Sequence, residues 1–116
     1  MKEQFSRTAL LLGDEAMERL FSARVAVFGL GGVGGFAAEA LARAGVGALD
    51  ICDNDTVSES NRNRQLLALE STLGKKKTEV AAARLRDINP GLKLTTYDTF
   101  FLPETAGEFD FSKWDY

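Results

Sequence analysis

Histidine is absent from this chain of 116 residues. Without an imidazole the chain cannot build a Ser/His or Cys/His catalytic pair or a histidine metal site, so proton transfer has to use carboxylates, amines or outside groups. Cys52 is the only cysteine, which excludes an internal disulfide and a four-cysteine zinc site and favours a reducing compartment. No apolar run approaches the roughly 20 residues of a membrane span, and the N-terminus lacks the apolar core of a signal peptide. We therefore expect a cytoplasmic protein without a membrane segment.

The residues that are present describe a folded domain of nearly balanced charge. Of the residues, 45% are hydrophobic and 27% are charged, and 14 Lys and Arg oppose 17 Asp and Glu. These fractions are typical of one globular domain and exclude a disordered or collagen-like chain. The formal net charge of −3 argues against a protein whose whole surface binds nucleic acid, but it leaves room for a local basic patch.

Two stretches of helical spacing open the chain. They cover residues 5–12 and 14–21, and Gly13 separates them. Asp14 has the side chain of an N-cap, so we expect it to cap the second helix. The two helices predict an arm over residues 1–22 that lies on the main domain.

The remainder, residues 23–116, alternates between strand and helix signals. Short apolar runs rich in β-formers predict strands at 24–28, 48–52 and 92–97. Amphipathic spacing predicts helices at 33–44 and 74–88. The first helix is expected to bury a stripe of Val33, Phe36, Ala37, Ala40, Leu41 and Ala44. This order predicts an α/β fold, the first β-α-β-α-β half of a Rossmann-like, doubly wound and mostly parallel sheet.

A doubly wound domain normally needs a second half to cover its sheet. Seven of the eleven aromatic residues lie in the last twenty positions, where the chain stops without a polar tail. We therefore expect the chain to be a truncated piece of a larger protein.

A glycine-rich segment lies between the first expected strand and the first expected helix. Residues 29–34 read Gly-Leu-Gly-Gly-Val-Gly, a G-x-G-x-x-G pattern. Glycine lets the backbone turn tightly and approach a phosphate, whose charge the free N–H groups at the helix start stabilise. The alternative is a turn that packs strand on helix without a ligand. The glycines expected to bind a nucleotide are Gly29, Gly31, Gly32 and Gly34.

Asp53 follows the second expected strand, 19 residues beyond Gly34. An acidic side chain at this place can accept hydrogen bonds from the hydroxyl pair of a ribose. NAD and ATP fit this arrangement equally well, and a solvated loop aspartate is the other interpretation. Asp53 alone therefore does not choose the nucleotide.

Cationic and amide side chains after the second strand favour ATP over NAD. Arg64 has a planar guanidinium that suits bidentate contact with a phosphate, and Lys77 supplies a point charge. Attack on the α-phosphate of ATP needs fixed cations there and on the departing pyrophosphate, so we expect both residues to be catalytic. Residues 62–86 hold seven of the fourteen basic residues, which also permits an RNA-facing patch; for Lys75 and Lys76 a solvated helix face is preferred.

Several motifs in a fixed order resemble the ThiF/MoeB/HesA family of ubiquitin-activating-like adenylating enzymes. They begin at residues 29, 42, 53, 74 and 88 and read Gly-Leu-Gly-Gly-Val-Gly-Gly, Ala-Arg-Ala-Gly-Val-Gly, Asp-Asn-Asp-Thr-Val-Ser-Glu-Ser-Asn-Arg-Asn-Arg-Gln, Gly-Lys-Lys-Lys-Thr-Glu-Val and Ile-Asn-Pro. The arm from residue 7, the stretch 62–69 and the segment 109–116 are most similar to the tRNA threonylcarbamoyladenosine dehydratase branch. The resemblance covers residues 5–116.

The resemblance implies an ATP-dependent, Mg²⁺-using enzyme, ligase-like in its chemistry, that adenylates a carboxylate. In the dehydratase branch the acceptor is N6-threonylcarbamoyladenosine at position 37 of tRNA, which the enzyme closes to a cyclic form. Carried over by position, the resemblance implies phosphate contacts for Gly31, Asn61, Arg64 and Lys77, a ribose contact for Asp53, and a homodimer in which Arg7 reaches the partner's nucleotide. The magnesium-binding aspartate of the family would follow Tyr116, so no metal ligand is predicted in this chain.

Three other functions remain open from the sequence. The first is an adenylyltransferase that activates the C-terminal glycine of a ubiquitin-like sulfur carrier for thiamine or molybdopterin synthesis. The second is a non-catalytic NAD-binding module, for which the glycine pattern and Asp53 would suffice. The third is a scaffold that binds tRNA through residues 62–86 without chemistry.

Overall fold

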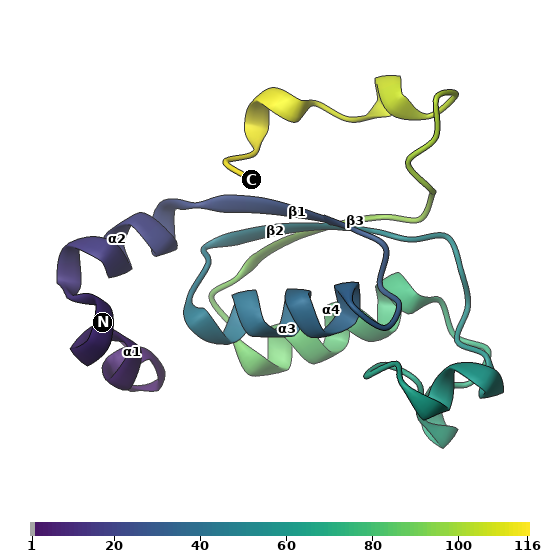
Figure 1. Ribbon diagram of the computed structural model, residues 1–116, viewed down its shortest axis with the longest axis horizontal. Coiled ribbons are helices and arrows are strands. Elements are labelled where there is room, and N and C mark those ends of the chain that lie inside the picture. The colour runs from purple at the N-terminus through teal and green to yellow at the C-terminus, as the bar shows by residue number, and fades with distance from the viewer. Residues whose placement is uncertain (1) are drawn as a thin grey trace.

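Three parallel strands form the centre of the molecule. The computed structural model describes residues 2–116 and orders the strands β1-β2-β3, with the bounds Arg24–Phe28, Ala48–Cys52 and Lys93–Tyr97. Two helices, α3 (Gly34–Ala44) and α4 (Lys77–Ile88), connect the strands and lie on one side of the sheet (Figure 1). The arrangement confirms the expected α/β fold and the first half of a Rossmann-like sheet.

An aliphatic core fills the space between the sheet and these two helices. Alternate residues of a strand point to opposite faces, so Leu49 and Ile51 of β2 lie on the helix side, where both are completely buried. Ala81 and Leu85 of α4 pack into the same core, as the spacing of that helix predicted. The core fixes both helices against the sheet and thereby fixes the loops that enter them.

The buried face of α3 differs from the predicted stripe. Gly35, Ala38 and Ala42 are buried, whereas Val33 and Phe36 of the predicted stripe are 84% and 54% exposed. Small side chains let the helix approach the sheet closely, and bulky ones at these positions would hold it away. The prediction was wrong because it followed hydrophobicity, while the close approach of helix to strand selects for size.

The N-terminal arm consists of a 3₁₀ turn (Glu3–Phe5) and two helices, α1 (Ser6–Leu12) and α2 (Asp14–Ser22). The predicted cap is wrong, because Asp14 is the first helical residue of α2, Gly13 occupies the cap position, and no side chain caps it. The arm lies at the amino ends of the strands (Figure 1). It therefore sits at the opposite end of the sheet from the turn that enters α3.

Two further boundaries differ from the prediction. Helix α4 begins at Lys77 rather than at residue 74, because Lys76 is extended and forms a β-bridge with Thr56 in the segment that follows β2. Strand β3 begins at Lys93, one residue later than expected. Short 3₁₀ turns at Glu59–Asn63 and Glu70–Thr72 occupy the connection between β2 and α4.

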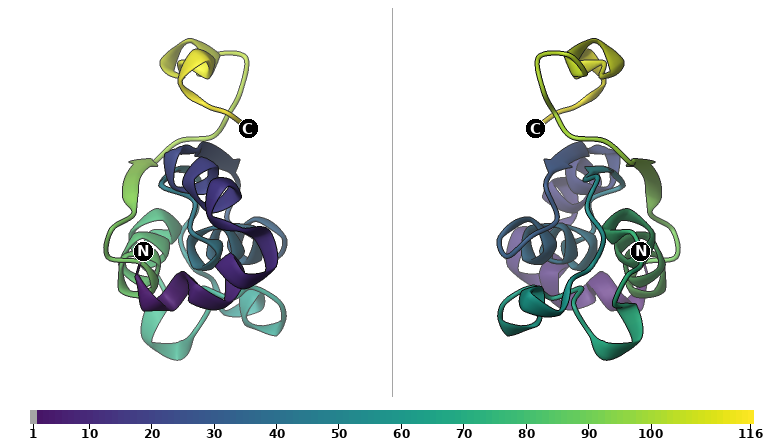
Figure 2. Two further views of the ribbon diagram at one scale, coloured as in Figure 1. Left: turned by 90° about the vertical axis from the view of Figure 1, so that its left-hand side faces the viewer. Right: turned by 90° about the vertical axis from the view of Figure 1, so that its right-hand side faces the viewer.

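Aromatic side chains cover part of the sheet face that α3 and α4 leave free. The chain after β3 passes over this face, on the side away from the helices (Figure 2). Ring contacts join Phe28 of β1 with Phe101, Phe109, Phe111 and Trp114. The backbone of Asp115 and Tyr116 hydrogen-bonds to Arg24 and Ala26 at the edge of β1.

Every helix within residues 2–116 is too short or too polar to cross a bilayer.

Candidate functional site

The carboxyl ends of β1 and β2 are joined by hydrogen bonds through one buried aspartate. Asp53 is 4% exposed; one carboxylate oxygen accepts from the Leu30 amide at 2.7 Å and the other from the Asp55 amide at 2.8 Å. The amide of Gly29 donates to the carbonyl of Cys52 at 2.8 Å. Each Asp53 oxygen retains a lone pair, so the carboxylate holds the glycine turn in place and can still accept from a ligand.

The fold requires glycine at two positions of the turn. Gly29 has a φ of +93°, which side chains rarely adopt, and a Cβ on Gly34 would lie 1.7 Å from the Gly29 carbonyl oxygen. Positions 31 and 32 are different. A Cβ on Gly31 would meet nothing closer than the Gln65 side-chain nitrogen at 3.7 Å, and one on Gly32 nothing closer than Arg64 at 3.8 Å. The protein alone therefore leaves room for a Cβ there.

Backbone donors at this turn have no protein acceptor. Within residues 2–116, the amides of Gly31, Gly32 and Val33 donate to no backbone or side-chain oxygen. They lie at the start of α3, an 11-residue helix whose N-terminus carries partial positive charge. Free donors, positive charge and room on the glycines together form a cradle for an anion.

The 3₁₀ turn after β2 brings the stem of Arg64 to this cradle. The turn is closed by Asn61, whose side-chain oxygen accepts from the Ser58 amide at 3.0 Å. The stem of Arg64 lies next to Gly32, and its Nη1 donates to the Asn63 side chain at 2.7 Å. In the described part of the chain no carboxylate lies within ion-pair distance of Arg64, whereas Arg62 pairs with Glu70 at 2.7 Å. Arg64 therefore keeps an uncompensated charge.

Lys77 contributes a buried cation at the same edge of the sheet. It is the first residue of α4 and 5% exposed, and its Nζ lies 3.8 Å from a carboxylate oxygen of Asp55. Its neighbour Lys76 instead pairs with Asp98 at 2.6 Å, and Lys75 is exposed. Burial of an ammonium group requires compensation, which Asp55 supplies only at long range.

The only cysteine is no nucleophile at this site. Burial and the nearby Asp53 carboxylate raise the pKa of the Cys52 thiol to about 11. The thiol donates to the Thr99 carbonyl oxygen at 2.8 Å and is 3% exposed. It is therefore protonated at neutral pH and enclosed in the fold.

The structure brings most of the predicted site residues to one edge and leaves one apart. Arg7 is exposed on α1, in the arm at the amino ends of the strands, away from the glycine turn of its own chain (Figure 1). Gln65 ends the stretch 61–65 that favoured ATP in the sequence, but it was assigned no role of its own there. It is 9% exposed and lies beside the turn. The apolar run 66–69 that follows it was the available signal for its burial.

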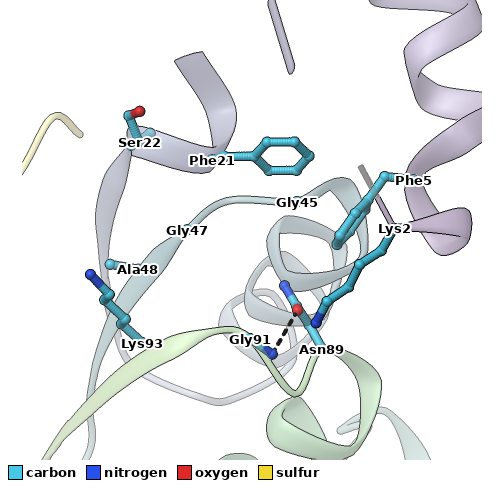
Figure 3. A pocket seen from close by; sticks show the side chains of 11 residues that line it. Lys2, Phe5, Phe21, Ser22, Gly45, Gly47, Ala48, Asn89, Gly91 and Lys93 are labelled. Carbon is cyan, nitrogen blue, oxygen red and sulfur yellow. Dashed lines mark hydrogen bonds between the residues drawn. The ribbon is translucent and has the colours of Figure 1, made fainter. Parts of the chain in front are cut away.

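A hollow with a volume of about 830 Å³ lies elsewhere, at the amino ends of the strands. Phe5 and Phe21, with ring centroids 5.3 Å apart, line it on the arm side, and Lys2 and Lys93 extend along it (Figure 3). Within it, Asn89 accepts from the Gly91 amide at 3.2 Å. The hollow therefore lies at the interface between the arm and the sheet.

Comparison with known proteins decides the family of this site. The model of the ThiF family matches residues 5–116. The chain belongs to the ThiF family. The tRNA threonylcarbamoyladenosine dehydratase of Bacillus subtilis (strain 168) is 49% identical to this ThiF-family chain over 109 residues, which are 94% of the chain and 43% of that protein. The molybdopterin-synthase adenylyltransferase of Salmonella typhimurium is 46% identical over 94 residues, 79% of the chain and 38% of that protein.

Solved structures agree with this membership. The Escherichia coli tRNA N6-threonylcarbamoyladenosine dehydratase TcdA in complex with ATP superposes on this ThiF-family chain with a TM-score of 0.89 and 43% identity, covering 91% of this chain and 44% of that one. The same enzyme was also solved in complex with AMP. The chain therefore spans about two fifths of the length of the relatives that it matches.

Proposed function

We propose that this chain is the nucleotide-binding part of an ATP-dependent, carboxylate-adenylating tRNA N6-threonylcarbamoyladenosine dehydratase. The supporting observation is the edge of the sheet where free backbone donors, an unpaired guanidinium and a buried ammonium group converge. The relatives with the same name and the ATP complex of TcdA support the choice of nucleotide and acceptor. The proposal includes the inference that the chain is a piece of a longer protein.

The residues present fit ATP by charge and by space. ATP carries about four negative charges, and donors fixed in advance stabilise such charge without reorganisation. The free amides of Gly31 and Gly32 and the cations of Arg64 and Lys77 lie on one edge, and the room for a Cβ at both glycines is room for a phosphate. NAD has only two phosphate charges and gives no reason for both cations.

Each residue has one task in this proposal. Asp53 accepts from the ribose hydroxyls while it holds the glycine turn through the Leu30 amide. Asn61 closes the turn that presents Arg64, and its side-chain nitrogen is free to donate to a phosphate. Arg64 and Lys77 bind the α-phosphate and the departing pyrophosphate.

The reaction that follows is an exchange of groups at the α-phosphate. A carboxylate oxygen of the threonylcarbamoyl group attacks the α-phosphorus in line, and the bond to pyrophosphate breaks. An atom within the same group then attacks the activated carbonyl carbon and releases AMP, so the nucleoside loses the elements of water. The protein contributes positioning and charge stabilisation, and no side chain becomes covalently modified.

Three partners belong to the proposal as well. Mg²⁺ would accompany the phosphates of ATP; within residues 2–116 no group of three or more Cys, Asp or Glu side chains gathers as a metal site, so no ligand is assigned to it. A second copy of the protein would complete the site through Arg7, which lies away from its own glycine turn. The tRNA would supply the carboxylate.

The similarity to a molybdopterin-synthase adenylyltransferase supports a second candidate, activation of the C-terminal glycine of a ubiquitin-like sulfur carrier. The two candidates share the chemistry at phosphorus and differ only in the acceptor. The ATP site of this chain therefore serves both, and the acceptor has to be found by experiment.

The complete gene product, incubated with Mg²⁺, ATP and tRNA that carries threonylcarbamoyladenosine, tests the proposal. We expect mass spectrometry of the nucleosides to show a product lighter by one water, formed together with AMP. An unchanged nucleoside in a preparation that binds ATP would transfer the assignment to a sulfur carrier. A preparation that binds NAD in preference to ATP would reject both candidates.

A further inference from the structure

Gln65 is a buried side chain whose carboxamide has no hydrogen-bond partner among the described residues. Its Oε1 is enclosed, and within residues 2–116 it accepts from no donor. It is the one buried side-chain atom of the described residues in this condition, while the other buried polar groups near it, such as Asp53, have partners. A buried amide oxygen without a donor destabilises a fold, so a carboxamide kept in this state calls for a partner.

The backbone holds this carboxamide against the glycine turn. The Gln65 amide donates to the Asn61 carbonyl at 2.8 Å, and the Gln65 carbonyl accepts from Ala68 at 3.1 Å. At the other end of the side chain, Nε2 lies 3.7 Å from the point that a Cβ of Gly31 would occupy. Within the described residues neither end of the carboxamide has a hydrogen-bond partner in the protein, and Nε2 is the end that lies next to the glycine turn.

We propose that Gln65 is a nucleotide-binding residue whose carboxamide donates from Nε2 to a phosphate oxygen held at Gly31. The inference rests on the proposed function, because it needs a nucleotide on the glycine turn. The Nε2 donor then joins the free amides of Gly31 and Gly32 around one anionic group.

A neutral amide has a distinct use beside Arg64 and Lys77. It adds a hydrogen-bond donor close to the phosphate without adding charge. The directional hydrogen bond orients the phosphate, while the two cations attract its negative charge. A carboxylate at the same place would repel the phosphate, and a thioether would offer no donor. Two substitutions of nearly constant shape, Gln65→Glu and Gln65→Met, thus separate the donor from the bulk of the side chain.

The test compares these variants with a matched change at the other end of the sheet. Gln4, in the arm, donates from Nε2 to the Ile88 carbonyl at 3.1 Å, so Gln4→Met removes an amide that is already in use. The complete gene product and its variants are titrated with ATP, AMP and adenosine by calorimetry. Thermal melting is recorded without nucleotide.

We expect Gln65→Met to raise the Kd for ATP and AMP about tenfold, the loss of one good hydrogen bond, while adenosine binding stays unchanged. The melting temperature without nucleotide should remain or rise, because the unpartnered oxygen is gone. Gln65→Glu should weaken ATP binding further, and Gln4→Met should leave it unaltered.

Wild-type affinity for ATP in Gln65→Met would overturn the inference and leave the proposed function intact. An equal loss of adenosine binding would also overturn it, since the contact would then lie away from the phosphates. A lower melting temperature with unchanged affinity would assign Gln65 a purely structural role. Failure of the wild-type protein to bind ATP would instead reject the proposed function from which the inference starts.

Discussion

At the amino ends of the strands the arm and the sheet leave a hollow of about 830 Å³, and at the carboxyl ends the glycine turn meets the 3₁₀ turn that carries Arg64 and Gln65. The two ends differ in their hydrogen bonding. Around the hollow, Asn89 bonds both to Gly91 and to the Ala42 carbonyl, and the Gly47 amide donates to Leu20. At the carboxyl ends, three backbone amides, the Arg64 charge and the Gln65 oxygen have no such partners.

The difference teaches that the volume of a hollow and the presence of polar groups free to bind a ligand are separate properties. The hollow results from the docking of α2 against the sheet, and the Asn89 carboxamide within it is already hydrogen-bonded to the protein. At the carboxyl ends the exposed Arg64 and the free amides of the glycine turn offer charge and donors to an anion, and the enclosed Gln65 oxygen lacks a partner. Substitutions at the two ends should therefore separate stability from nucleotide binding.

Gly34→Ala should have the largest effect, because it places a Cβ 1.7 Å from the Gly29 carbonyl oxygen, where neither backbone can move freely. We expect the cooperative thermal transition to disappear.

Gly31→Ala has room for its Cβ, so the variant should be at least as stable as the wild type. A gain of about 0.5 kcal/mol in unfolding free energy is expected, and it would raise the melting temperature. Its Kd for ATP should rise at least about tenfold. Normal ATP binding by Gly31→Ala would show that the nucleotide does not approach this glycine.

Asp50→Asn tests a buried polar group whose partners are all present. Asp50 is 2% exposed and accepts from Arg24 at 2.8 Å and from the Trp114 indole at 3.0 Å. Burial by itself would raise the pKa of Asp50, but the hydrogen bonds from Arg24 and Trp114 outweigh it and hold the pKa below its usual value. We expect the variant to lose about 3 kcal/mol of unfolding free energy at pH 7, with ATP affinity retained in the folded protein.

The pH dependence of this loss has a definite sign. A carboxylate with a lowered pKa in the folded state stabilises the fold fully above about pH 4, the ordinary aspartate value, and the stabilisation disappears as the pH falls through the folded-state pKa. The difference between wild type and Asp50→Asn should therefore shrink in urea titrations below about pH 4. A difference that stays constant down to pH 2 would mean that the carboxylate charge is not what stabilises the fold.

Arg64→Ala tests the charge left unpaired at the carboxyl ends. In the complete gene product, AMP formation with ATP and tRNA should fall about 100-fold or more in kcat/KM, roughly 2.7 kcal/mol of transition-state stabilisation. Arg62→Ala is the matched control, since Arg62 lies two positions away and is engaged with Glu70. Equal losses in both variants would show that the general basic character of the turn matters, rather than the position of Arg64.

The sequence predicted the elements whose signals are local. β1 and β2 are short apolar runs, and β3 is rich in β-forming residues. The constraints on Gly29 and Gly34 arise from a turn within one strand-to-helix connection. The β-α-β-α-β order and the glycine turn could therefore be predicted. The edge that gathers Asp53 and Lys77 followed from the rule that parallel strands end on the same side. These are properties of neighbouring residues and of sheet geometry.

What could not be predicted depends on contacts between distant segments. The buried face of α3 is set by how closely the helix approaches β1, so Gly35 and Ala38 are inside while Phe36 is outside. Gln65 is buried because a 3₁₀ turn places its side chain beside Gly31, 34 positions earlier in the chain. Hydrophobic periodicity cannot predict either contact, because it reflects only residues that are close in the sequence.

Asn89→Ala should have the smallest effect, confined to stability. Removal of the amide leaves the Gly91 N–H and the Ala42 carbonyl without their side-chain partner, which we expect to lower the unfolding free energy by about 1 to 2 kcal/mol. The Kd for ATP should stay unchanged, because Asn89 lies at the amino ends of the strands. Lys93→Gln, an exposed position along the same hollow, serves as the control and should alter neither quantity. Weaker ATP binding by either variant would show that the hollow takes part in nucleotide binding, and the division between the two ends would then be wrong.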